Sequence, residues 1–124
     1  MRHAAASLIV MSLLLAAGPA AAAGDAARGP AVFTHCSGCH ALSAGDVIVG
    51  PSLHELFGRK AGTVAGFSYS KALAGSGIIW DEASLRKFLA DPGGTVPGTK
   101  MQSGAVTDPQ QLDDLISYLK TATR

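Results

Sequence analysis

Aromatic and charged residues are both scarce in this sequence of 124 residues. Aromatic residues make up 6% of the chain and charged residues 15%, and the formal net charge is +1 at pH 7. No run of lysines or arginines stands out, and few aromatics lie between the basic residues. These features give no support for nucleic-acid binding. The length leaves room for a single domain.

Long hydrophobic runs are absent except at the N-terminus, where one has the layout of a secretory signal peptide. Met1–His3 is a short basic start, Ala4–Ala17 is apolar, and Ala21–Ala23 are the small residues that a signal peptidase requires. The apolar run is shorter than the ~20 residues that span a bilayer, which disfavours an uncleaved anchor. We therefore predict a cleaved signal peptide over residues 1–23 and one domain over residues 24–124, in an exported and periplasmic protein.

Cysteine occurs only twice, at Cys36 and Cys39. A cysteine pair in an exported protein ordinarily indicates a disulfide. Here the loop that a disulfide would close is so short that it would restrain little of the unfolded chain. His40 follows directly, and Cys-x-x-Cys-His is the attachment pattern of a c-type haem. Both sulfurs would form thioethers with haem vinyl groups, and the histidine would be an axial ligand of the iron.

Two further roles of the cysteine pair remain open at this point. A thioredoxin-like dithiol uses Cys-x-x-Cys, but it belongs to an alternating pattern of strands and helices that this sequence lacks. A zinc site requires two further ligands, and there is no second cysteine pair. A chance match to the attachment pattern is the last alternative.

Strand patterns are also scarce, and the periodicity predicts an all-α fold. Val47–Val49 is too short to found a sheet. A first helix is expected roughly over Asp25–Cys39, with its regular part beginning just before Pro30. A second helix follows Trp80, with Asp81 as its cap, and the prolines and glycines of Asp91–Gly94 end it. A short helical turn is expected near Tyr69–Leu73.

The third main helix has the clearest signals. Thr107–Gln110 contains a capping residue, a glutamine three positions later and a proline in the opening turn. One apolar stripe follows, and a polar face is expected to point outward. The stripe consists of Leu112, Leu115, Ile116 and Leu119, and the outward face of Asp113, Asp114 and Lys120.

The stretch between His40 and Tyr69 has no regular pattern. A loop of this length is unusual in a compact domain, unless it folds over something other than protein. Three short helices also provide only a small hydrophobic core, and small domains of this kind are usually stabilised by a covalent cross-link or a bound group. A large apolar cofactor would give the scattered apolar residues of this loop a surface to pack on. These residues are Leu53, Leu56, Phe57, Val64 and Phe67.

Methionine is rare as well, and this identifies a candidate for the second axial ligand. Of three methionines, two lie in the signal peptide, which leaves Met101. Met101 lies in an irregular, glycine-containing segment between two helices. His35 and His54 are the rival ligands, and both are expected to be at least partly exposed. A filled position favours electron transfer, whereas an open one invites peroxide or gas chemistry.

The sequence resembles the class I cytochromes c, close to the mitochondrial and bacterial c2 types. The resemblance covers essentially the whole predicted mature chain. The matching blocks, in order, are Gly50–Gly62, Gly66–Ser70, Gly77–Trp80, Pro97–Met101 and Asp114–Lys120. It implies the small single-domain cytochrome c fold, with three main helices and long loops wrapped around one covalently bound haem.

The resemblance also implies roles for individual residues near the haem. The carbonyl of Pro51 should accept a hydrogen bond from Nδ1 of His40. Tyr69 and Trp80 should donate to a haem propionate, and Arg59 should lie near the same propionate.

Further contacts follow from the same resemblance. Thr99 and Phe88 should line the Met101 side of the site. Gly29 should let the N-terminal helix cross closely over the C-terminal helix, against Leu115 and Tyr118.

The function implied is that of a monomeric carrier of single electrons, not an enzyme. Its partners would be membrane or periplasmic redox proteins, such as a bc1-type reductase, an oxidase or a dehydrogenase. The lysine-rich stretch of mitochondrial relatives is replaced by Gly93-Gly94-Thr95. A modest positive patch remains possible from Lys60, Lys71, Arg86, Lys87 and Lys100. The sequence leaves open an enzyme-like haem protein, which needs Met101 to be off the iron, and a subunit dedicated to one partner.

Overall fold

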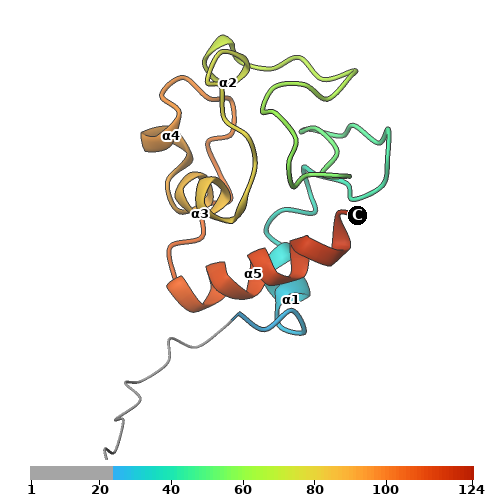
Figure 1. Ribbon diagram of the computed structural model, residues 1–124, viewed down its shortest axis with the longest axis vertical. Coiled ribbons are helices and arrows are strands. Elements are labelled where there is room, and N and C mark those ends of the chain that lie inside the picture. The colour runs from blue at the N-terminus through green and yellow to red at the C-terminus, as the bar shows by residue number, and fades with distance from the viewer. Residues whose placement is uncertain (1–23) are drawn as a thin grey trace, which may run out of the picture.

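The computed structural model describes residues 24–124, so the predicted signal peptide lies outside the described residues. Within this range the chain forms helices joined by long loops, and no β-strand (Figure 1). The helices are α1 (Gly29–Phe33), α2 (Lys71–Ala74), α3 (Glu82–Ala90), α4 (Pro92–Thr95) and α5 (Pro109–Ala122). The prediction of an all-α fold is confirmed. No helix in this range is long and apolar enough to cross a membrane.

Helix α5 forms where the capping signals predict it. The side chain of Asp108 accepts a hydrogen bond from the backbone N–H of Gln111 at 2.8 Å, and Pro109 occupies the first turn. All four residues of the predicted apolar stripe are buried, and Leu115 is completely so. The prediction that Asp114 faces outward is wrong: its exposed fraction is only 3%.

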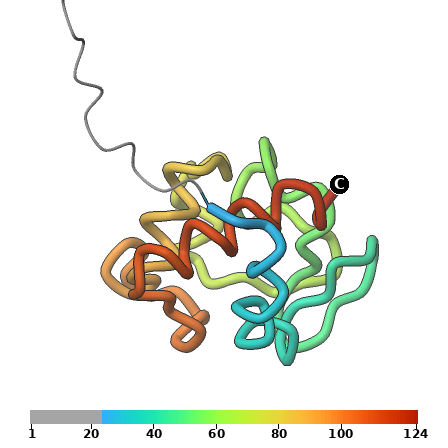
Figure 2. The backbone as a smooth tube through the Cα atoms, turned by 90° about the horizontal axis from the view of Figure 1, so that it is seen from below, coloured from blue at the N-terminus to red at the C-terminus, as the bar shows by residue number. Residues whose placement is uncertain are grey.

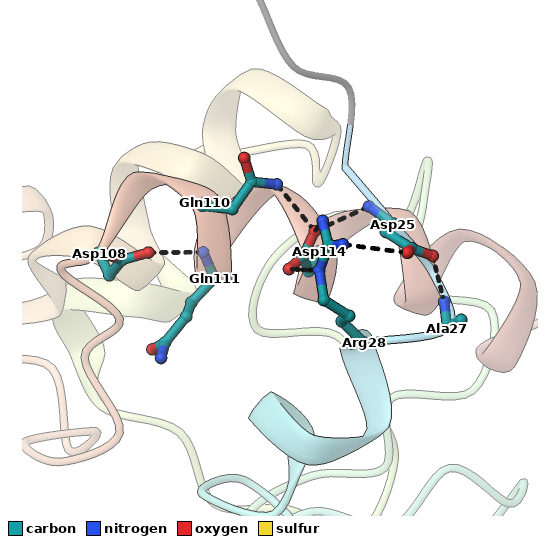
Figure 3. Close-up of polar contacts among 7 residues, drawn as sticks. All are labelled: Asp25, Ala27, Arg28, Asp108, Gln110, Gln111 and Asp114. Carbon is teal, nitrogen blue, oxygen red and sulfur yellow. Dashed lines mark hydrogen bonds and ion pairs between the residues drawn. The ribbon is translucent and has the colours of Figure 1, made fainter.

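Asp114 is buried because it anchors the N-terminal segment to α5 (Figure 3). Its carboxylate accepts hydrogen bonds from the backbone N–H of Asp25 (2.7 Å), from Nε and Nη2 of Arg28 (2.9 and 3.1 Å) and from Nε2 of Gln110 (3.0 Å). The Arg28 guanidinium, followed by the Asp25 N–H, holds the pKa of Asp114 well below its usual range. The sequence pattern does not distinguish Asp114 from its neighbour Asp113, which is partly exposed and pairs with Arg86.

Helix α1 crosses α5 at close range, as the tube in Figure 2 shows. A Cβ atom on Gly29 would lie 2.1 Å from Cβ of Tyr118 and 2.8 Å from the carbonyl oxygen of Asp114. The predicted close crossing at Gly29 and Tyr118 is therefore confirmed. The second close neighbour is the backbone of Asp114; Leu115 lies deeper in the core.

Helix α1 is shorter than the sequence predicts. It begins at Gly29, with Pro30 in its first turn, but it ends at Phe33 and does not continue to Cys39. Beyond Phe33 the hydrogen bonds alternate between i−3 and i−4 partners: the Cys36 and Ser37 N–H groups both donate to the Phe33 carbonyl, at 2.8 and 3.0 Å. The chain thus leaves the regular α-helix in tight turns that contain the Cys-x-x-Cys-His segment.

Helices α2, α3 and α4 form the other side of the domain. Asp81 and Ser84 make a reciprocal capping box that starts α3. Ser70 caps the short α2, close to the turn predicted there. Asp91 ends α3, as expected, but its side chain also caps the Gly94 N–H, so the segment predicted only as a helix stop forms the one-turn helix α4. Trp80 and Phe88 pack at a ring separation of 5.2 Å within this half of the core.

Candidate functional site

A cavity of about 210 Å³ lies between the helices and the long loops. Every residue that the sequence pattern and the resemblance assigned to the site lines it: Cys36, Cys39, His40, Pro51, Arg59, Tyr69, Trp80, Thr99 and Met101. The volume is more than ten times the ~10–15 Å³ that one buried water needs. The rest of the wall is largely apolar and includes Leu85, Leu89, Leu115 and Leu119 from α3 and α5. The cavity therefore suits a large apolar group.

The histidine side of the cavity is held by backbone contacts. Nδ1 of His40 lies 2.8 Å from the carbonyl oxygen of Pro51, the contact that the resemblance implied. A carbonyl can only accept, so Nδ1 carries the proton and Nε2 is left as the free lone-pair nitrogen. Gly50 packs on the ring, because a Cβ there would lie 2.6 Å from Cε1 of His40. The sequence did not indicate this role of Gly50.

The two cysteines are free thiols that line the same cavity. Burial, and then the charge of Cys39, raises the pKa of the Cys36 thiol. A redox dithiol has the opposite property, a lowered pKa that favours the reactive thiolate. Among residues 24–124 there is also no cluster of three His, Cys, Asp or Glu side chains that could hold a metal ion by themselves. The raised pKa of Cys36 is thus unlike that of a redox dithiol, and both cysteines face the cavity beside His40.

Met101 lines the cavity from the loop between α4 and α5. Its backbone N–H donates to Oγ1 of Thr99 at 3.3 Å, and the Thr99 N–H donates to the Val96 carbonyl at 3.0 Å. The end of this loop is tied to α3 by the bond from the Val106 N–H to the Leu89 carbonyl at 2.8 Å. Two fixed points thus define where the thioether of Met101 can reach.

Arg59, Tyr69 and Trp80 are polar groups in a largely apolar wall. The Arg59 guanidinium donates to the carbonyl oxygens of His54 (2.6 Å) and Ser52 (3.1 Å), and no carboxylate of the described residues forms an ion pair with it. Burial lowers the pKa of Arg59, although not enough to discharge a guanidinium.

A half-buried cation without a carboxylate partner fits an anionic substituent on a bound group. The Tyr69 hydroxyl accepts from the Val64 N–H at 3.1 Å, so its own proton stays available to donate. The carbonyls that orient Arg59 left no signal in the sequence, because backbone acceptors are the same for every residue type.

The structure separates the remaining candidates. Leu53, Leu56 and Phe67 line the cavity, as expected of the long loop, whereas Phe57 and Val64 line a neighbouring surface groove, so that part of the expectation is wrong. His54 also lines that groove and does not line the cavity. His35 is exposed at the cavity mouth. Phe88 lies in the cavity wall with Thr99 and Met101, as implied.

Comparison with known proteins gives consistent matches. The family model described as Cytochrome c matches residues 26–123. Cytochrome c2 iso-2 of Magnetospirillum fulvum is 47% identical over 95 residues, which cover 77% of this chain and 99% of that protein. Cytochrome c2 of Blastochloris viridis is 48% identical over 101 residues, 81% of this chain and 80% of that one.

A solved structure agrees with the sequence matches. Cytochrome cH from Methylobacterium extorquens superposes with a TM-score of 0.74 at 46% sequence identity, and it covers 79% of this chain and 99% of its own. The likeness thus extends over nearly the whole of the described domain, which holds the apolar cavity, the Cys-x-x-Cys-His segment and the methionine loop. This chain belongs to the cytochrome c family, as a class I c-type cytochrome.

Proposed function

We propose that this protein is an exported monohaem carrier of single electrons, with haem c attached through Cys36 and Cys39 and its iron held by His40 and Met101. The observation that carries the proposal is the convergence of these four side chains on one apolar cavity from two segments far apart in the sequence. Its family consists of electron carriers, not enzymes. The residues present fit haem c: two thiols, an imidazole, a thioether, a largely apolar wall and a guanidinium that forms no ion pair within residues 24–124.

The residues of the chain have distinct tasks in this proposal. Pro51 and Gly50 fix the tautomer and ring orientation of His40, so that Nε2 serves as the ligand. Thr99 holds the backbone of Met101. When bound, haem c supplies a one-electron iron couple, and His/Met ligation gives it a higher potential than two imidazoles would.

The polar residues and the walls complete the site. Arg59, Tyr69 and Trp80 would neutralise or hydrogen-bond propionates. The leucines of α3 and α5 exclude water and lower the local dielectric. We also propose that residues 1–23 are removed on export to the periplasm. Gly24 belongs to the folded domain, because a Cβ on it would lie 2.2 Å from the carbonyl oxygen of Asp113 on α5, which is consistent with cleavage before it.

The decisive test is the optical spectrum of the protein purified from the periplasmic fraction, oxidised and reduced. We expect a low-spin haem with the ferric methionine-to-iron band. Met101→Ala should remove that band, lower the potential and let carbon monoxide or imidazole bind the iron. His54→Ala is the matched control, because His54 does not line the cavity, and it should change neither property. A high-spin wild-type protein that binds carbon monoxide at once would overturn the proposal.

A further inference from the structure

Three consecutive apolar side chains are exposed in the loop that follows the Cys-x-x-Cys-His segment. The exposed fraction is 36% for Val47, 55% for Ile48 and 70% for Val49. They account for all but one of the exposed large hydrophobic residues found in residues 24–124; the other is Ile79. Single exposed apolar residues need no explanation, but a contiguous run on a soluble domain marks an interaction site or a liability. We call Val47–Val49 the apolar triplet.

The apolar triplet is held against the proposed attachment site. Val47 forms an isolated antiparallel bridge with His40, and the Gly50 N–H donates to the Cys39 carbonyl at 2.7 Å. Val49 also lines the cavity while most of its surface is exposed, which places it at the cavity mouth. The exposed surface of the triplet is therefore continuous with the opening through which electrons would pass.

The mouth of the cavity carries little charge. The residues that both line the cavity and are exposed at the surface are His35, Val49, Lys100, Gln102 and Ser103. Only Lys100 among them bears a fixed charge, and its Nζ donates to the Ser68 carbonyl at 2.7 Å. Asp46, next to the triplet, accepts a hydrogen bond from Ser43.

Of the five basic residues that the sequence suggested as a patch, only Lys100 lines the cavity. Lys60, Lys71, Arg86 and Lys87 do not line the cavity, and Arg86 pairs with Asp113. With nine basic and nine acidic residues after residue 23, the domain also has no net charge to guide a strongly charged partner.

We propose that the apolar triplet is the docking site for a redox partner protein whose own contact surface is apolar and weakly charged. This inference rests on the proposed carrier function. Burial of the triplet would bring the partner against the cavity mouth, where Val49 joins the cavity lining to the exposed surface. A patch of three side chains suits the small interfaces of transient electron-transfer encounters. Since complementary charge is nearly absent at the mouth, salt should affect association little.

The test measures how fast the ascorbate-reduced holoprotein is oxidised by membranes prepared from the source cells. The variants are Ile48→Lys and Ile48→Glu, which place opposite charges at the centre of the triplet. We expect both to slow oxidation about ten-fold, because either charge would have to lose its hydration in an apolar contact. The wild-type rate should change less than about two-fold between ~0.01 M and ~0.15 M ionic strength.

The matched controls are Ile79→Lys and Ile79→Glu. Ile79 is 50% exposed, nearly the same as Ile48, but it does not line the cavity. These variants should be oxidised at the wild-type rate, and all four should keep the wild-type spectrum and unfolding midpoint.

Several outcomes would overturn the docking inference while leaving the carrier function intact. They are opposite effects of Ile48→Lys and Ile48→Glu, unchanged rates for both, or equal slowing by the Ile79 variants. A dimer in sedimentation that Ile48→Lys disperses would also overturn it, because the triplet would then be covered by a second copy of this chain. A wild-type protein with an intact spectrum that the membranes never oxidise would instead contradict the carrier function itself, and the docking inference with it.

Discussion

The crossing of α1 and α5 gives a prediction whose size follows from the structure. Gly29→Ala would place a Cβ atom 2.1 Å from Cβ of Tyr118. Carbon atoms in contact are ordinarily ~3.5–4.0 Å apart, so α1 would have to move by about 1.5 Å. The contacting atoms are the stem of a side chain and a backbone carbonyl, neither of which can rotate away. The helix itself must shift, and the Cys-x-x-Cys-His segment that follows it shifts as well.

The cost combines two opposing contributions. Overpacking of this kind costs about 1–3 kcal/mol, and alanine regains up to about 1 kcal/mol of helix propensity over glycine. Because the required shift is large, we expect a net loss of about 2 kcal/mol in the free energy of unfolding. For a domain of about 100 residues this lowers the Tm by about 8–16 °C.

The assay is denaturant and thermal unfolding of the holoprotein, followed by circular dichroism and by the Soret absorption. Gly93→Ala is the matched control, because no atom lies within 4 Å of a Cβ placed on Gly93 in α4. It should be neutral or stabilising by up to about 1 kcal/mol. A Gly29→Ala protein within about 0.5 kcal/mol of wild type, the usual range of surface substitutions, would refute the argument that this glycine is required for the crossing.

Two further predictions concern the polar contacts. Asp114→Asn should destabilise the protein at neutral pH, because an uncharged amide cannot replace the carboxylate that Arg28 binds. The pKa of Asp114 is lower in the folded protein than its unfolded value of about 4. Its ionised carboxylate therefore stabilises the fold fully above pH ~4, and this stabilisation is lost as the pH falls towards the folded pKa. The variant lacks this carboxylate, so it should lose less stability than wild type on acidification. Parallel unfolding curves from pH 7 to pH 2 measure this, and equal slopes for the two proteins would contradict it. Tyr69→Phe should lower the free energy of unfolding by about 0.5–1.5 kcal/mol in urea titrations, because it leaves the Val64 N–H without its acceptor. Tyr118→Phe should have little effect, since its hydroxyl makes no hydrogen bond to the described residues. A loss as large as that of Tyr69→Phe would contradict the assignment of the effect to the bond from Val64.

The helices differ in how well local sequence predicts them. The cap at Asp108, Pro109 and the apolar stripe are all local signals, and α5 follows them closely. The start of α1 is also local, because Pro30 restricts it, but no cap or proline in the sequence marks its end at Phe33. The proline and glycines of Asp91–Gly94 predict the end of α3. In the structure the Asp91 side chain also caps a further helical turn, α4.

The site residues also differ in how well local sequence predicts them. Cys36, Cys39 and His40 are neighbours in sequence, so their chemistry could be inferred from spacing alone, and Met101 remained by elimination. The contact between His40 and Pro51 required a resemblance to known proteins. The role of Gly50 against the His40 ring had no signal in the sequence.

The sequence by itself determined the all-α class, the attachment segment and the candidate ligands, because caps, apolar periodicity and short motifs act over a few residues. Only the tertiary structure decided which polar groups are buried and which apolar ones are exposed. The sequence pattern places Asp114 at the surface, whereas it is buried in an ion pair with Arg28; the apolar run Val47–Val49 is exposed, with Val49 at the mouth of the cavity. Burial depends on which segments the fold brings together, and that information is not local to any stretch of the chain.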